Sequence, residues 1–427
     1  MTSILVLVFV LTYAAIALEE LLRINKSASA LIGAGLLWTL YALSGADPHL
    51  IDEELAESLI ATAQIAFFLI GAMTIVEVVD AHDGFEIITS RLRATKLAGL
   101  AWFLAGVTFV LSAILDNLTT TIVMVSLLSK LLREREHRLW LTGVIVIAAN
   151  AGGAWSPIGD VTTTMLWIGG QVTTQAIVTR LFVPSLVNLA VPLAIVSYIL
   201  RGRTVVAPKV ADGAEGPHCR PFERNVMFAL GLATLAGVPA FKAITHLPPF
   251  LGVLFGLGIL WAVGDVLHRD KKPAERRTVT IGHALTRIDM SAIVFFVGIL
   301  LAVATLEHTG VLAGLATWLD ATIGRLDVIV VSFGLLSAII DNVPMVAAAM
   351  GMYDLGTHPP DSFLWEFMAY AAGTGGSILI IGSAAGVAAM GIEKVGFLWY
   401  ARRFAPLALL GYFAGAGVYL LEAALLG

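Results

Sequence analysis

The chain has 427 residues, of which 58% are hydrophobic and only 13% are charged, with a formal net charge of −5. Because an average soluble domain is about 25% charged, this composition excludes a soluble protein and indicates an integral membrane protein. Its basic residues lie in a few loops and form no stripe for nucleic acid, and the single cysteine, Cys219, excludes an internal disulfide or thiolate metal cluster. The lipid bilayer is therefore an expected partner, nucleic acid is not, and no cofactor is expected.

Apolar stretches of membrane-spanning length begin at the N-terminus. Met1 to Leu18 lacks the basic start of a signal peptide and is predicted to be the first span. Stretches such as Leu181 to Leu200 reach the roughly 20 residues that a helix needs to cross a bilayer. Arginine and lysine concentrate in five loops, near residues 91–96, 133–138, 201–224, 269–287 and 394–403. By the positive-inside rule these loops are cytoplasmic. We therefore expect a multi-pass protein of a bacterial cytoplasmic membrane with both termini on the outer, periplasmic side.

Two apolar stretches are too short to cross the membrane twice, yet each has flanks of one charge type. Residues 97–132 lie between basic loops, and residues 326–352 lie between loops of the outward type. The first contains Ser112 to Asn117 (SAILDN), and the second contains Ser337 to Asn342 (SAIIDN), 225 positions later. Non-helical backbone at membrane depth is tolerated only where protein or a water-filled cavity surrounds it. The sequence therefore predicts two re-entrant hairpins with Asp-Asn at their tips.

The span after each hairpin contains a Gly-Gly pair. The pair that begins at Gly152 is matched 223 positions later by the pair that begins at Gly375. Glycine costs about 1 kcal/mol and proline about 3 in a helix interior, and Pro157 follows the first pair closely. We therefore expect both spans, 139–170 and 363–392, to be broken helices with an unwound middle. Close packing between helices is the alternative use of a Gly-Gly pair.

The nearly equal offsets indicate an internal duplication. We expect a first repeat at 1–202, a cytoplasmic linker at 203–224 and a second repeat at 225–427. If the hairpins do not cross the membrane, each repeat has five spans, and the odd number inverts one repeat relative to the other. The expected fold class is an all-α membrane protein with two inverted five-span repeats, each with a re-entrant hairpin and a broken helix. That architecture is typical of secondary transporters.

The polar residues of these segments offer mainly oxygen atoms. Ser112 lies four residues before Asp116, and Ser337 four before Asp341, so each hydroxyl shares a helix face with a carboxylate. Hard cations prefer oxygen ligands, and carboxylates inside a membrane are costly enough that function is the default interpretation. Because a buried carboxylate stays protonated unless a cation compensates it, sodium and protons could compete for one site. The candidate ion- or proton-binding residues are Ser112, Asp116, Asn117, Asn150, Ser156, Asp160, Thr162, Thr163, Ser337, Asp341, Asn342, Thr374 and Ser377.

Two stretches, Asn150 to Gln171 (NAGGAWSPIGDVTTTMLWIGGQ) and Ile114 to Leu128 (ILDNLTTTIVMVSLL), resemble the NhaD-type sodium/proton antiporters of the ion transporter superfamily. The resemblance covers nearly the whole chain. It implies exchange of Na⁺, and also Li⁺, for H⁺ by alternating access, with Na⁺ at Asp116, Asn117 and Asp160. A dicarboxylate-transporting branch looks similar in architecture but carries Ser-Asn-Thr at both tips, where an aspartate would repel an anion.

The second half is poorer in oxygen. Where the first hairpin continues with threonines from Thr119, the second continues with Pro344, and Ser383 stands at the position that matches Asp160. We therefore expect Asp341 to be linked to protons or to be structural. Charged groups at the span ends are expected to be solvated; these are Glu77, Asp80, His82, Asp83, Lys242, Glu307 and His308. A homodimer, if one forms, is expected to use the first three spans of each half.

Other functions stay open at this point. A divalent cation/H⁺ exchanger fits oxygen-rich acidic sites as well, and an arsenite or dicarboxylate transporter could use the same scaffold. An intramembrane aspartyl protease is the distant alternative, but the Gly-Asp pairs at Gly159 and Gly264 lack the first glycine of its Gly-x-Gly-Asp motif, and no enzyme is expected. For Asp116, Asp160 and Asp341 the structural alternative is helix N-capping, which at Asp160 could coexist with ion binding.

Overall fold

The computed structural model describes residues 2–85, 87, 96–204, 219–271 and 278–426, and within these ranges the chain is helical, with one isolated β-bridge between Lys96 and Thr204. Seven of the described helices are long and apolar enough to cross a membrane by length and composition. The prediction of an all-helical membrane fold is confirmed. Most of the expected linker, residues 205–218, and the basic loop positions 91–95 and 272–277 lie outside the described residues.

The helices fall into two groups by their contacts. The first group, called the flanking helices, comprises α1 (Thr2–Ala17), α3 (Lys26–Ala42), α4 (Pro48–Ala81), α11 (Pro221–Thr245), α12 (Pro249–Leu267) and α15 (Met290–His308). The second group, called the central bundle, comprises α6 (Leu97–Leu115), α7 (Asn117–Leu131), α8 (Arg135–Ala154), α9 (Val161–Ile168), α10 (Thr174–Ile199), α17 (Leu326–Leu336), α18 (Asn342–Met352), α19 (Phe363–Gly375), α20 (Ala384–Glu393) and α22 (Ala405–Leu426). Four further helices lie between these along the chain, namely α2 (Glu19–Leu22), α14 (Ile281–Arg287), α16 (Val311–Thr322) and α21 (Phe397–Arg403).

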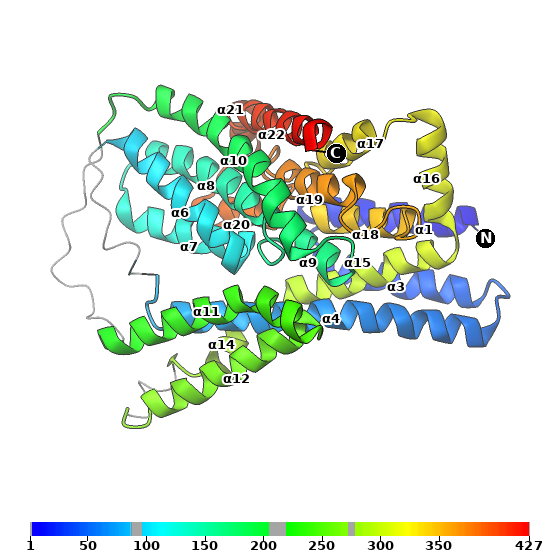
Figure 1. The fold of residues 1–427 in the computed structure, drawn as a ribbon, viewed down its shortest axis with the longest axis horizontal. Coiled ribbons are helices and arrows are strands. Elements are labelled where there is room, and N and C mark those ends of the chain that lie inside the picture. The colour runs from blue at the N-terminus through cyan, green and yellow to red at the C-terminus, as the bar shows by residue number, and fades with distance from the viewer. Residues whose placement is uncertain (1, 86, 88–95, 205–218, 272–277, 427) are drawn as a thin grey trace.

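The two hairpins lie toward opposite ends of the long axis of the molecule. Figure 1 shows α6 and α7 in the left half of the view, and α17 and α18 right of its centre, toward the N-terminus. One residue, Asp116, separates α6 from α7, whereas residues 337–341 separate α17 from α18. The flanking helices α4, α11 and α12 form a layer beneath the central bundle.

Both Gly-Gly spans are interrupted after the glycines. Residues 155–160 separate α8 from α9, and residues 376–383 separate α19 from α20. The glycines also allow close packing, because a Cβ atom at Gly152 would collide with the backbone of Phe109, and one at Gly375 with the backbone of Gly334. The second segments then pack across the halves, since α9 contacts α18 and α20 contacts α7.

Two element starts differ from the expected ranges. The helix α8 begins at Arg135 rather than at 139, and its Arg138 pairs with Glu393 at 3.0 Å. The helix α11 begins at Pro221, inside the stretch 203–224 that was expected to be linker. Proline is well suited to the first position of a helix because its missing N–H has no intrahelical partner there.

Candidate functional site

Three aspartates cap helices whose first turns meet in the central bundle. Asp116 accepts hydrogen bonds from the backbone N–H and the hydroxyl of Thr119, both at 2.8 Å. Asp160 accepts from the backbone N–H of Thr162 at 2.8 Å and from its hydroxyl at 2.7 Å. Asp341 accepts from the backbone N–H of Val343 at 3.3 Å. All three aspartates therefore cap helices, as the structural alternative predicted. Each carboxylate has further acceptor positions that the cap does not use.

Asp116 carries backbone strain at the tip of the first hairpin. Its φ is 83° and its ψ is 159°, a combination that is essentially restricted to glycine and costs an ordinary residue about 1–3 kcal/mol. Asp341 at the matching position has a φ of −46°. A carboxylate kept at a glycine-like position is consistent with a functional constraint on the side chain.

The carboxylate of Asp160 is where the two hairpin tips converge. Asn117 donates from its amide nitrogen to one carboxylate oxygen, and Asn342 donates to both at 3.4 and 3.5 Å. The amide of Asn117 also donates to the side-chain oxygen of Asn150 at 3.0 Å, and Asn150 donates to the hydroxyl of Ser383 at 3.0 Å. All five residues are buried, so a continuous polar network links both hairpins and both broken helices.

A small cavity lies beside this network. Its volume is about 20 Å³, and Asp116, Asp160 and Thr164 line it on the side of the central bundle. The flanking helices α4 and α11 close it with apolar side chains, which are Phe68, Leu69, Ala72, Met73 and Leu235. A cavity needs about 10–15 Å³ to hold one water molecule, so this one has room for a particle of that size beside two aspartates.

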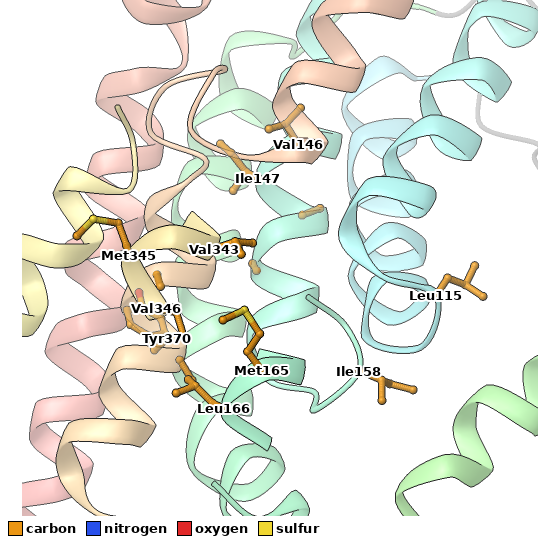
Figure 2. Close-up of a cluster of buried hydrophobic side chains, with 14 of the residues drawn as sticks. Leu115, Val146, Ile147, Ile158, Met165, Leu166, Val343, Met345, Val346 and Tyr370 are labelled. Atoms are coloured by element: carbon orange, nitrogen blue, oxygen red, sulfur yellow. The ribbon is translucent and has the colours of Figure 1, made fainter. Parts of the chain in front are cut away.

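The surroundings of the network are apolar. Figure 2 shows Met165 of α9 near Val343 and Val346 of α18, while Leu115 and Ile158 point away from this group. A carboxylate in such surroundings is stable only when it is hydrogen-bonded and its charge is compensated or removed. The site therefore requires either a cation or protons at its two carboxylates.

The remaining predicted residues hold the segments together. Ser112 donates to the carbonyl of Ala149 at 2.6 Å, and Ser156 donates to that of Ala113 at 2.5 Å, so each bond joins the first hairpin to the first broken helix. The hydroxyls of the other four donate to carbonyls of their own or adjoining segments at 2.7–3.4 Å; these residues are Thr163, Ser337, Thr374 and Ser377. Their hydroxyl protons are thus used for packing the bundle.

Two further residues belong to the site: Ser383, which the sequence matches with Asp160 but which is not among the candidate ion-binding residues, and Lys26. Ser383 caps α20 and accepts from the backbone N–H of Gly386 at 3.2 Å. Its φ and ψ, −146° and 153°, reproduce those of Asp160, −145° and 148°, so its position opposite Asp160 in the duplication was a usable signal. Lys26 pairs with Asp341 at 3.2 Å, and no local motif in the sequence indicates that contact.

The expected solvation of the span ends is wrong for His82, whereas Lys242 is partly exposed. His82 is fully buried and its ring stacks on His268 with centroids 4.9 Å apart. Lys242 donates to the backbone carbonyl of Trp167 at 2.5 Å and lies 4.5 Å from the centroid of its ring. Both groups are held by partners on other helices, which periodicity does not reveal.

Comparisons with known proteins place the chain among transporters. A family model described as a citrate transporter matches residues 13–375. The chain is 49% identical to sodium/proton antiporter 1 of Arabidopsis thaliana over 97% of the chain and 71% of that protein, and 45% identical to its sodium/proton antiporter 2 over 97% and 98%. It is 32% identical to the Na⁺/H⁺ antiporter NhaD of Vibrio cholerae over 97% and 90%. Among solved structures, the YdaH transporter of Alcanivorax borkumensis matches with a TM-score of 0.59 over 94% and 98% of the two chains, at 14% identity, which is a similarity of fold.

Proposed function

The chain belongs to the family of the NhaD sodium/proton antiporters, and from this premise we propose that it exchanges Na⁺, and also Li⁺, for H⁺ across a membrane, with Asp116 and Asp160 as the groups that bind the ion or the protons. The single observation that carries the assignment of the site is the cavity of about 20 Å³ that these two carboxylates share. It is large enough for one small ion, and two acidic residues line it.

Competition between the two substrates follows from charge. Two carboxylates facing one apolar cavity repel each other and lack the solvation that water would give them. Either Na⁺ between them or protons on them relieves this cost, and the two solutions exclude each other. Asn117 and Asn342 donate to Asp160, which favours its charged form and hence Na⁺ binding.

Alternating access requires the cavity to lie between parts that can move against each other. The cavity wall consists of Asp116 and Asp160 on one side and residues of α4 and α11 on the other, such as Ala72 and Leu235. We propose that the hairpins and broken helices move as a unit against the flanking helices, exposing the carboxylates to one side at a time. The inverted arrangement of repeats 1–202 and 225–427, with 203–224 as the linker, is part of this proposal, and the opposite placement of the hairpins supports it.

The competing functions have no comparable support. An anion such as a dicarboxylate or arsenite would need neutral or basic groups at the hairpin tips, but Asp116 and Asp160 face the cavity. A divalent cation exchanger would usually supply 6–8 oxygen ligands for Ca²⁺, which a cavity for one water-sized particle does not offer. Relatives that share 45–49% of their residues with this chain carry the name sodium/proton antiporter.

Location and assembly complete the proposal. The positive-inside rule supports cytoplasmic basic loops and outer termini in a bacterial cytoplasmic membrane. Large apolar side chains are exposed on the flanking helices, for example Ile244 at 79% and Val266 at 75%. These faces suit contact with lipid or with a second copy in a homodimer formed by the first three spans of each half.

Everted membrane vesicles with an internal pH dye test the function. When the interior has been acidified, addition of Na⁺ or Li⁺ should raise the internal pH as protons leave in exchange, and Asp116→Asn and Asp160→Asn should abolish the response. Asp47→Asn is the matched control, because Asp47 also caps a helix but is exposed and far along the chain from the site. If either variant still exchanges Na⁺ for protons, the altered aspartate is not required for ion binding and its assignment is wrong. A calcium and a citrate series in the same vesicles decides between the competing substrates.

A further inference from the structure

The second hairpin tip carries an ion pair with a flanking helix. The Lys26 ammonium, at the start of α3, lies 3.2 Å from a carboxylate oxygen of Asp341, and the two side chains are 27% and 15% exposed. The same ammonium lies 4.4 Å from the ring centroid of Phe295 on α15. A lysine held by a carboxylate and an aromatic face is fixed in position, since a cation is attracted by the ring as well as by the acid.

The matching tip of the first hairpin has no such partner. Among the described residues, Asp116 and Asp160 form no ion pair with a basic side chain, and Asp116 accepts hydrogen bonds from the backbone of Leu118 and from the backbone and hydroxyl of Thr119. The duplication thus places the same Asp-Asn tip in two electrostatic situations. One tip faces the small cavity, and the other faces a cation that the protein itself supplies.

The pair joins the two groups of helices. Lys26 and Phe295 belong to the flanking helices α3 and α15, which pack against each other, and Asp341 caps α18 in the central bundle. Tyr13 on α1 lies within electrostatic reach of Asp341, and its buried hydroxyl has no hydrogen-bond partner in the described part of the chain. This phenol is therefore a polar group without a described partner in the electrostatic neighbourhood of Asp341.

We propose that Lys26 is a positioning residue that acts as the resident counter-cation of Asp341, so that the second hairpin tip binds no transported ion while the pair is closed. This inference rests on the proposed sodium/proton exchange and deepens it. Each movement of the second hairpin against α1, α3 and α15 then separates or restores the pair. The first half of the duplication then binds Na⁺ and protons. In the second half, the position of the hairpin determines whether Asp341 is paired with Lys26.

A double-mutant cycle tests the pairing. Removing one partner leaves the charge of the other unpaired. Lys26→Met and Asp341→Asn should therefore each lower the maximal rate of Na⁺-driven proton release by about tenfold. Removing both partners leaves no unpaired charge. The double variant K26M/D341N should return to within about threefold of the parent. Lys26→Arg, which keeps the charge, should stay near the parent. The Na⁺ KM should change little throughout, because Asp116 and Asp160 bind the ion.

The matched control is Lys242, which also bridges a flanking helix and the central bundle but contacts a backbone carbonyl. Lys242→Met combined with Asp341→Asn should show no rescue. Failure of K26M/D341N to exceed the single variants, at equal protein in the membrane, overturns the inference. So does a tenfold rise of the Na⁺ KM in Asp341→Asn, since Asp341 would then bind the ion.

A second measurement does not depend on the single variants being well folded. In a Cys219→Ser background, Lys26→Cys and Asp341→Cys together can be linked by a short bismaleimide, which should stop exchange by preventing the two groups from separating. Full exchange in the linked protein contradicts the proposal. If the unlinked parent shows no Na⁺-driven proton release, the proposed function itself fails; if the parent responds and Asp116→Asn does not, only the role of Lys26 is at stake.

Discussion

Asn342 donates from its amide nitrogen to the carboxylate of Asp160, at 3.4 and 3.5 Å to the two oxygens, although 182 positions separate the residues in the chain. The second hairpin thereby contacts the acid of the first broken helix directly. Any displacement of the second hairpin tip changes the number of hydrogen bonds that this carboxylate receives. The two halves are therefore coupled at the residue to which we assign ion binding.

The two asparagines should differ in their effect on sodium. The contact of Asn117 with Asp160 is the shorter one, and Asn342 reaches the same group only at 3.4–3.5 Å. Hydrogen bonds to charged groups contribute about 1.5–3 kcal/mol when well formed and less at such distances. We expect Asn117→Ala to raise the Na⁺ KM about tenfold or more and Asn342→Ala about threefold.

The assay is Na⁺-driven proton release in vesicles at fixed pH, with the exposed Asn225→Ala as control. Both increases should shrink as the pH rises, because fewer protons then compete for the carboxylate whose charged form has lost a donor. Equal KM values for the parent and Asn117→Ala would show that the amide does not support ion binding.

Ser383 should contribute to stability rather than to ion affinity. It caps α20 and accepts the amide hydrogen bond of Asn150. Loss of an N-cap hydroxyl costs about 1 kcal/mol, and Asn150 loses an acceptor as well. Ser383→Ala should therefore lower the thermal unfolding temperature of the purified protein in detergent, with a Na⁺ KM within about twofold of the parent. A tenfold rise of the KM would instead identify Ser383 as an ion ligand.

The elements of the fold could be predicted because they depend on local chemistry. The hairpin 326–352 coincides with α17 and α18, and the Gly-Gly pairs precede real interruptions of two helices. Composition, loop charge and repeated motifs are each visible within a window of a few tens of residues. The three aspartates could be selected in the same way, because a carboxylate in an apolar run stands out in the sequence.

The partners of those aspartates could not be predicted from the same signals. Lys26 reaches Asp341 across 315 positions, and nothing near Lys26 in the chain marks it as different from other lysines at span ends. The convergence of Asn117 and Asn342 on Asp160 depends on how the halves pack, with α9 against α18. For the serines and threonines, the sequence suggested oxygen ligands for an ion. In the structure most of their hydroxyls instead donate to backbone carbonyls.

Two cavities follow each other along α4, and we propose that the larger one is the entrance to the smaller. A cavity of about 270 Å³ is lined by Thr62 and Ile65, together with Glu57, and the small cavity beside Asp160 is lined by Phe68 and Ala72 further along the same helix. In a Cys219→Ser background, Thr62→Cys should react with a membrane-impermeant maleimide added to the outer side. Ala72→Cys should react more slowly, and Na⁺ should slow it further by holding the small cavity closed.

This labelling also tests the orientation. Reaction of Thr62→Cys only from the cytoplasmic side would reverse the proposed topology without affecting the assignment of the ion site. Ala72→Cys that reacts as fast as Thr62→Cys would show that the cavity at Asp160 is already open to that side.

The buried pair His82 and His268 predicts how stability depends on pH. His82 follows α4, and its pKa is lowered, mainly because burial disfavours the charged ring; the carbonyl of Val78 and the acids Glu223 and Asp83 act against this, while Lys271 acts with it. The facing ring nitrogens of His82 and His268 are 3.1 Å apart, so one of them must lack a proton for a hydrogen bond to form.

The sign follows from proton linkage. The unfolded chain has an ordinary histidine pKa of about 6.5, so below that pH it binds a proton that the folded protein resists. The stability contributed by a neutral His82 is therefore fully present above about pH 6.5 and is lost as the pH falls toward the lowered pKa of the folded state. We expect the unfolding temperature in detergent to fall on acidification through this window, and the fall to be smaller in His82→Gln. The exposed His49→Gln is the matched control; an unfolding temperature that depends on pH equally in the parent and in His82→Gln would mean that another group is responsible.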